Sequence, residues 1–193
     1  MATAVPYTVL LLSLVVAVHE CERLPQITSC ASPPPCFDLF ILQRMTRHVS
    51  KGVSSADGEN IFLKSQTFDK IRKKKDLHSC VIEKIVDFCV QVLSVSHGMN
   101  YLLELISMMD TLKSCVYKMN KRCAMLYQKA AEQTPLEILE ADMTAEEVAI
   151  YQLQKINSAS ERLYDKNVQE RVLDELKSLH NYIPGRGFRK TSV

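Results

Sequence analysis

The sequence contains no tryptophan, only five glycines and no Cys-x-x-Cys pair. Because that pair is missing and the five histidines are scattered, the chain has no zinc-ligand pattern. Motifs of the type Gly-x-Ser-x-Gly, His-Glu-x-x-His or a phosphate-binding loop are also missing, so no enzyme signature is present. We therefore expect a protein that is not an enzyme and that uses neither a cofactor nor a metal.

The charges of the chain nearly cancel. The net charge of +2 comes from 24 basic and 22 acidic residues. A chain balanced in this way has no global field to attract nucleic acid, so we expect no specific nucleic-acid partner. The alternating hydrophobic pattern of β-strands is absent throughout, which predicts an all-α fold.

The first residues read as a targeting segment. Residues 1–17 carry no charged side chain and centre on an apolar core about ten residues long. This core is too short for a transmembrane helix but is typical of a signal peptide, so we predict cleavage and secretion to the extracellular space. We divide the remainder into an irregular lead-in rich in cysteine and proline (18–36), a helical domain (37–183) and a basic flexible tail (184–193).

Hydrophobic residues recur at helical spacing in several stretches of the domain. We expect helices over residues 37–51, 77–96, 99–119, 144–164 and 167–183. Residues 53–68 read as a long loop that Ile61 and Phe62 pin to the core. Residues 124–143 read as an acidic connection in which a short helix can start at Thr134.

Two of these helices carry start signals. Thr144 with Glu147 forms a capping box. The last helix is expected to start with Asn167 as N-cap and Glu170 as the capping-box acid, and to stop at Pro184. Its hydrophobic residues fall on one face, which needs a matching surface from the rest of the domain. These residues are Val168, Val172, Leu176, Leu179 and Ile183.

All cysteines follow the predicted signal peptide, which indicates a disulfide framework. They are Cys21, Cys30, Cys36, Cys80, Cys89, Cys115 and Cys123. Cys80 and Cys89 lie about 13 Å apart and half a turn around one predicted helix, so they cannot bond to each other. Cys89 lies within the apolar face and is our candidate for the free thiol that an odd count leaves. The alternatives are a free Cys21, a free Cys30 or an intermolecular bridge.

A run of basic residues follows the long loop. It consists of Lys70, Arg72, Lys73, Lys74 and Lys75. Such runs are usually solvated, and contact with an anionic glycan such as heparan sulfate is the functional alternative. Together with the basic tail, the run supports a second hypothesis for the whole chain, a cationic heparin-binding or membrane-active antimicrobial protein.

The order of features resembles that of the interleukin-10 family of class II helical cytokines. The shared features are secretion, Cys36 just before the first helix, a long loop, Cys80 at a helix start, and a helix closing on Cys115 and Cys123. In the final helix, the family pattern Lys-Ala-x-x-Glu-Leu-Asp aligns with residues 171–177, which read RVLDELK. The interleukin-20, -22 and -26 branch is the nearer one.

The resemblance implies a compact antiparallel bundle of six to seven helices with disulfides Cys36–Cys115 and Cys80–Cys123. It also implies a ligand that brings together two class II receptor chains and triggers Janus kinase and STAT signalling in immune or epithelial defence.

In the family, the matching segment of the last helix helps to contact the higher-affinity receptor chain. The positions carried over to this sequence are Arg171, Asp174, Glu175 and Lys177. We expect these four side chains to project to solvent along one edge of the helix, with local pairs such as Arg171 with Asp174 or Glu175. Lys177 stands where the family has an acid, so the receptor should lack the matching cation. The length of residues 124–143 favours a monomer over an intertwined homodimer.

Overall fold

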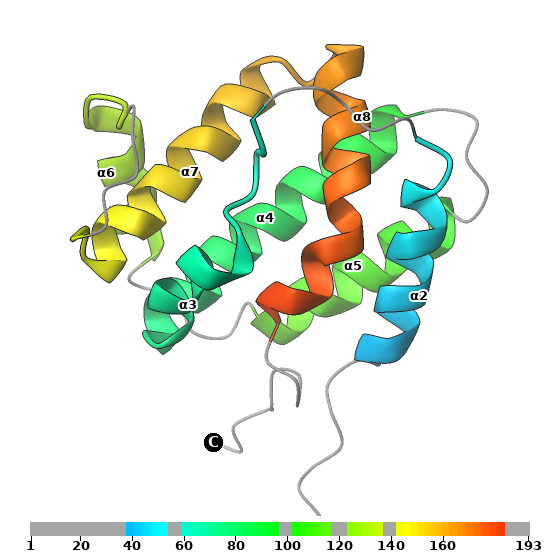
Figure 1. Ribbon diagram of the computed structural model, residues 1–193, viewed down its shortest axis with the longest axis horizontal. Helices are drawn as coiled ribbons and strands as arrows, with labels where there is room; N and C mark the ends of the chain where they lie inside the picture. Colours follow the sequence, from blue (N-terminus) through cyan, green and yellow to red (C-terminus); the bar gives the residue numbers. More distant parts are fainter. Residues whose placement is uncertain (1–37, 54–58, 97–101, 117–122, 137–141, 184–193) are drawn as a thin grey trace, which may run out of the picture. The chain divides into compact units, whose positions relative to one another are not determined.

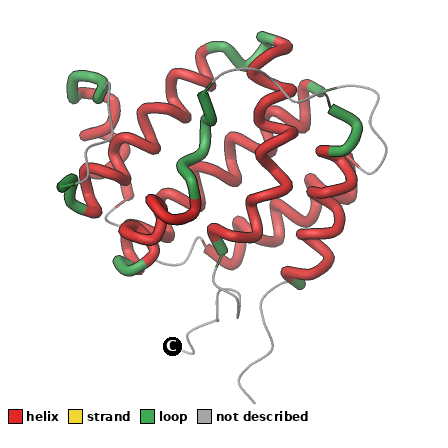
Figure 2. Tube along the Cα trace, in the orientation of Figure 1, coloured by secondary structure: helices red, strands yellow, loops and turns green. Residues whose placement is uncertain are grey.

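The computed structural model describes residues 38–53, 59–96, 102–116, 123–136 and 142–183 of the chain, all within one unit, Pro35–Val193. These residues form seven α-helices and a 3₁₀-helix, with no β-strand among them (Figures 1 and 2). The predicted all-α bundle is therefore confirmed. The predicted signal peptide (1–17), the lead-in (18–36) and the basic tail (184–193) lie outside the described residues, as do Cys21, Cys30 and Cys36.

The helices follow one another in the order shown in Figure 1. They are α2 (Leu39–Ser50), α3 (Ser65–Arg72), α4 (Lys75–Val95), α5 (Leu102–Val116), α6 (Cys123–Glu132), α7 (Ala145–Glu161), α8 (Lys166–Glu175) and the 3₁₀-helix η2 (Leu176–Tyr182).

The central element is α4, the longest of these helices with 21 residues. It packs against α3, α5, α6, α7 and α8. Residues 78–82 are all buried, so this helix is covered around most of its circumference near its start. A helix that is apolar on several faces is stable only inside such a shell of neighbours. The hydrophobic residues of α5 and α7 supply a large part of that shell.

Two helices were missed by the sequence reading. The α3 helix occupies the end of the expected loop and the start of the basic run, and it buries Phe68 and Ile71. The α6 helix occupies part of the expected acidic connection, and it buries Cys123, Leu126 and Ala130. Each has at most ten residues. A helix this short is marginal in isolation and too short for a clear periodicity, so tertiary packing decides its formation.

The start of α7 is as expected, but the start of the last helix is not. Thr144 and Glu147 form a capping box at the start of α7. The α8 helix is capped by Asp165, whose carboxylate accepts a hydrogen bond from the Asn167 backbone N–H at 2.9 Å. Asn167 was therefore the wrong N-cap, because the helix starts one residue earlier, at Lys166, and the Asp165 carboxylate accepts from the N2 amide.

The predicted apolar face of the last helix is confirmed, although its second half is a 3₁₀-helix instead of an α-helix. Its members are all buried, with at most 7% of their surface exposed, and they are Val168, Val172, Leu176, Leu179 and Ile183.

A disulfide joins α4 to α6. Cys80 and Cys123 are bonded, with their Cα atoms 5.2 Å apart, as the resemblance implied. Cys115 is also disulfide-bonded, but Cys36 lies outside the described residues, so the pairing of these two stays a prediction. Cys89 has a free thiol, as expected, and is fully buried. Burial raises the pKa of this thiol far above its usual range, which keeps it protonated and unreactive.

Candidate functional site

The four residues that the resemblance placed on a receptor-binding edge do not share one exposed edge. Lys177 is exposed and pairs with Asp174. Arg171 and Glu175 are half-buried and turn toward residues 59–62, where both form hydrogen bonds. The expectation that all four heads project to solvent is therefore wrong for Arg171 and Glu175. The expected pairing of Arg171 with the nearby acids is replaced by its contact with the Glu59 carbonyl.

Glu175 hydrogen-bonds to the backbone of the loop that precedes α3. Its two carboxylate oxygens accept hydrogen bonds from the backbone N–H groups of Ile61, at 2.8 Å, and Phe62, at 2.6 Å. Burial raises the pKa of Glu175 to about 7, against the opposing effect of the Phe62 and Ile61 amides, which favour the ionised form. The side chain therefore has a structural role, and few of its polar atoms remain for a partner.

Residues 59–63 form an extended segment that has no β-strand partner among the described residues, so side chains must satisfy its backbone. Gln152 of α7 is fully buried; its amide oxygen accepts from Leu63 N–H at 2.7 Å and its amide nitrogen donates to Ile61 C=O at 3.0 Å. The Tyr182 hydroxyl donates to Leu63 C=O at 2.6 Å. Figure 1 shows the segment descending between α7 and α8 to reach α3. Burial of Ile61 and Phe62, as expected, completes the attachment.

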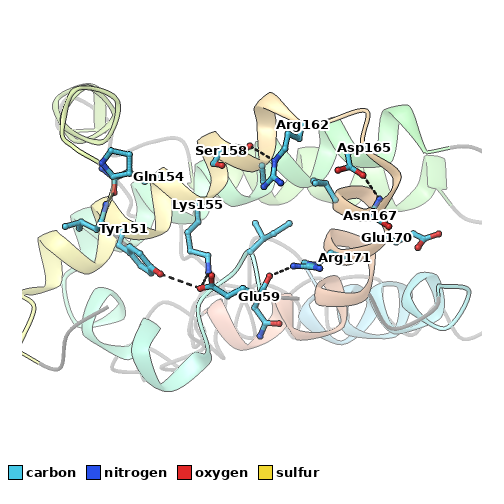
Figure 3. A pocket seen from close by; sticks show the side chains of 16 residues that line it. Glu59, Tyr151, Gln154, Lys155, Ser158, Arg162, Asp165, Asn167, Glu170 and Arg171 are labelled. Carbon is cyan, nitrogen blue, oxygen red and sulfur yellow. Dashed lines mark hydrogen bonds and ion pairs between the residues drawn. The ribbon is translucent and has the colours of Figure 1, made fainter. Parts of the chain in front are cut away.

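The outer end of this segment lines a polar groove of about 750 Å³ between α7 and α8 (Figure 3). Glu59 lies at its centre, where its carboxylate accepts from Lys155 Nζ at 2.6 Å and from the Tyr151 hydroxyl at 3.5 Å. Arg171 donates to the Glu59 carbonyl at 2.5 Å. The hydrogen bond and charge of Lys155 lower the pKa of Glu59. The charges at the centre of the groove are thus largely matched within the chain.

A different surface forms where the first and last described helices meet. The α2 helix packs against α8 and η2, and a cleft of about 610 Å³ lies between the end of α2 and η2. Three cations line it, Arg47 and Lys51 from the end of α2 and Lys177 from η2. Arg47 and Lys51 are exposed and form no ion pair with a described residue. We call these three residues the α2–η2 basic edge. The sequence reading missed its α2 half, because only the packing of α2 on η2 brings the residues together.

The basic run predicted as a glycan contact also separates into two groups. Lys70 donates to the Met143 carbonyl at 3.0 Å, and Arg72 pairs with Asp69 at 3.1 Å and donates to the Asn181 carbonyl. By contrast, Lys73, Lys74 and Lys75 are exposed and form no ion pair with any described residue. Only these last three keep the solvated character expected for the whole run.

Comparisons with protein-family models, with curated proteins and with solved structures gave no match. The resemblance to the interleukin-10 family therefore rests on the sequence features quoted above. Within the described part of the chain, no group of three or more His, Cys, Asp or Glu side chains is arranged to hold a metal ion.

The described helices also lack the combination of length and hydropathy that spans a membrane.

Proposed function

We propose that this chain is a secreted helical cytokine that brings together two class II receptor chains and signals through Janus kinases and STAT proteins. The proposal rests on the sequence resemblance and on one structural observation. Packing of α2 against α8 and η2 joins the two ends of the helical domain into a single edge. A receptor chain can therefore contact the first and last helices at once, which gives a partner more surface than either helix alone.

The charge of this edge indicates the kind of receptor surface that would fit. Arg47, Lys51 and Lys177 place three cations around one cleft, and Asp174 is the nearest acid that pairs with any of them. Opposite charges across an interface speed association and select between related partners. We propose that the higher-affinity receptor chain presents carboxylates to the α2–η2 basic edge. Under this proposal, Lys177 and Asp174 contact the receptor. Glu175 and Arg171 have mainly structural roles, through their hydrogen bonds to residues 59–62.

The receptor proposal is tested by surface plasmon resonance against a panel of class II receptor ectodomains. Lys177→Asp should weaken binding to the cognate chain about tenfold or more, because it places an acid against the expected carboxylates. Lys166→Asp is the matched control, since Lys166, at the start of α8, is also an exposed lysine and pairs with one acid, Glu170. It should change affinity less than about twofold. Equal losses in both variants, or no binding to any ectodomain, would contradict the proposal.

A cell-based assay separates this function from that of a cationic membrane-active protein. The same preparation is tested for receptor-dependent STAT phosphorylation and for leakage of liposomes. We expect phosphorylation that Lys177→Asp reduces and no leakage. Leakage without phosphorylation would favour the membrane-active alternative.

We further propose that the ligand is a monomer. Both α7 and α8 pack against α4 of their own chain, so the last helices need no second copy to cover their apolar faces. Light scattering at low protein concentration should give the mass of one chain. A dimer mass under these conditions would instead favour an intertwined homodimer.

A further inference from the structure

A second basic surface lies at the start of α4, in a cleft of about 750 Å³ between the α3–α4 turn, α6 and the start of α7. Four lysines line it, Lys73, Lys74 and Lys75 from the turn and Lys129 from α6. We call these residues the lysine corner. None of them belongs to the α2–η2 basic edge, so this site is independent of the proposed receptor contact.

The lysines of the turn are not used by the fold. Lys73, Lys74 and Lys75 are exposed and make no ion pair with the described residues, although Lys70 and Arg72 beside them are engaged. Three adjacent ammonium groups repel one another, and solvent or an anionic partner must offset this repulsion. Nothing in the described fold explains why all three positions are basic.

The fourth lysine comes from a remote part of the sequence. Lys129 lies on α6, which the Cys80–Cys123 disulfide fixes to the first turns of α4. Its amine contacts Glu146 at 2.5 Å, and both side chains remain about half exposed. Asp76 and Glu146 are the acids lining the cleft, so lysines outnumber acids there. The disulfide therefore adds a cation to the corner that the linear run of lysines lacks.

The start of α4 adds a further positive contribution. No side chain caps this helix, and Lys74 occupies the N-cap position. The first backbone N–H groups of a helix carry a partial positive charge and are ready donors to anions. This contribution supplements the lysine side chains and would not define a site without them.

We propose that the lysine corner binds the sulfate groups of a linear glycosaminoglycan. Several cations in an open, recessed cleft fit a flexible polyanion, whose sulfates can reach the lysines in turn. A membrane surface fits less well, because interfacial binding needs a broad exposed apolar face. Met125 is the only large hydrophobic side chain of this cleft that is strongly exposed, with 60% of its surface accessible, while Leu126 is buried. Glycan binding would hold the secreted protein near the cell surface.

The test measures binding to an immobilised heparin oligosaccharide of defined length, by surface plasmon resonance at physiological salt and over a salt series. The triple variant Lys73→Gln, Lys74→Gln, Lys75→Gln should lose affinity about tenfold or more. The salt dependence of its affinity should also become less steep, because fewer counterions are released from the polyanion. Lys129→Ser should cause a smaller loss, and the triple replacement of residues 73–75 by arginine should retain binding.

The matched control removes the same charge outside both basic surfaces, through Arg44→Gln, Lys64→Gln and Lys166→Gln in one chain, all at exposed positions. It should lose less than about twofold in heparin affinity. Equal losses in the two triple variants would show a response to net charge alone and overturn the site. Absence of heparin binding at physiological salt, or tighter binding to phosphatidylserine vesicles than to heparin, would also overturn it. Polyglutamate should compete weakly, and competition as strong as that of heparin would assign the corner to acidic proteins instead.

Discussion

The charged side chains around residues 59–63 and the lysines at residues 73–75 of the lysine corner differ in their contacts with the rest of the chain. Near residues 59–63, Lys155, Arg171 and Glu175 each contact another part of the chain within 2.5–2.8 Å. At the corner, residues 73–75 contact no charged partner among the described residues. A charged side chain that bonds to the backbone or to another side chain of the chain is held in place by the fold. A charged side chain without such contacts is available to bind another molecule.

This difference also separates the four residues of the last helix that were expected to share one exposed edge. Glu175 matches the family pattern, yet its contacts with Ile61 and Phe62 give it a structural reason to be acidic. Lys177 matches less well, yet it is exposed on the α2–η2 basic edge. We therefore expect substitutions of residues that contact residues 59–63 to lower the free energy of unfolding. Substitutions of Lys73, Lys74 and Lys75 should leave it nearly unchanged.

The largest effect is expected from the disulfide that attaches α6. Replacing both Cys80 and Cys123 by Ser should lower the free energy of unfolding by about 4 kcal/mol, because the bond closes a loop spanning a sequence separation of 43 residues. Urea denaturation with intrinsic tyrosine fluorescence and circular dichroism measures this change. The variant should also lose the contribution of Lys129 to heparin binding while keeping that of residues 73–75. Cys89→Ala is the control for removal of a buried thiol, with an expected cost of about 1 kcal/mol.

Next in size is the effect of reversing the charge of Glu175. Glu175→Lys should cost about 3 kcal/mol, because it leaves the amides of Ile61 and Phe62 without acceptors and places an ammonium group in a half-buried site. Asp174→Lys is the matched control one residue earlier, and removing its exposed pair with Lys177 should cost less than about 1 kcal/mol. Thermal and urea unfolding of both variants decide the matter. Equal stabilities would show that Glu175 does not hold the segment.

The raised pKa of Glu175 predicts a stability that depends on pH. The pKa of Glu175 in the folded protein, about 7, lies above the ordinary value of 4.5 that holds for the unfolded chain. Between these two pH values the carboxyl group is mostly protonated in the folded state and mostly ionised in the unfolded state. The contribution of this group is therefore fully present below pH 4.5 and decreases as the pH rises toward 7. Between pH 5 and pH 7 the loss is about 2 kcal/mol.

Glu175→Gln isolates this titration, because it cannot ionise but has nearly the same shape. The stability of the wild type minus that of Glu175→Gln should fall from pH 5 through pH 7 and level off near pH 8. Desolvation lowers the pKa of His78, which destabilises the fold toward acid pH, but this effect is common to both proteins and cancels in the difference. A flat difference curve would mean that the two amide contacts keep Glu175 ionised throughout.

The elements with long hydrophobic periodicity could be predicted from the sequence. The apolar face of the last helix, the capping box of α7 and the burial of Cys89 all follow from local spacing. The short helices α3 and α6 could not, since their stability comes from packing against α4 and α7. The 3₁₀ continuation of the last helix also has no local sequence signal that we identify.

The two candidate surfaces show the same limit. The sequence identifies residues 73–75 as exposed cations but cannot indicate that Lys129 joins them, because their proximity depends on the Cys80–Cys123 bond. Likewise, Lys177 can be singled out from the family pattern, whereas Arg47 and Lys51 are brought beside it by the packing of α2 on η2. The partners of Glu175 lie more than 110 residues away in the sequence, at separations of 113 and 114, so no local pattern contains them.

The smallest effect on stability is expected at Lys73, Lys74 and Lys75, which form no ion pair with a described residue. Replacing Lys73, Lys74 and Lys75 together by Gln, which adds no N-cap to α4, should change the free energy of unfolding by no more than about 0.5 kcal/mol, with a small gain from reduced repulsion. The single substitution Lys155→Met should cost more, about 1 kcal/mol, because Lys155 pairs with Glu59 and lies over the Tyr151 ring. Urea titrations at low and at high salt compare the two variants. If the triple variant proves the less stable one, the lysine corner is part of the fold, and its availability to a sulfated partner no longer follows.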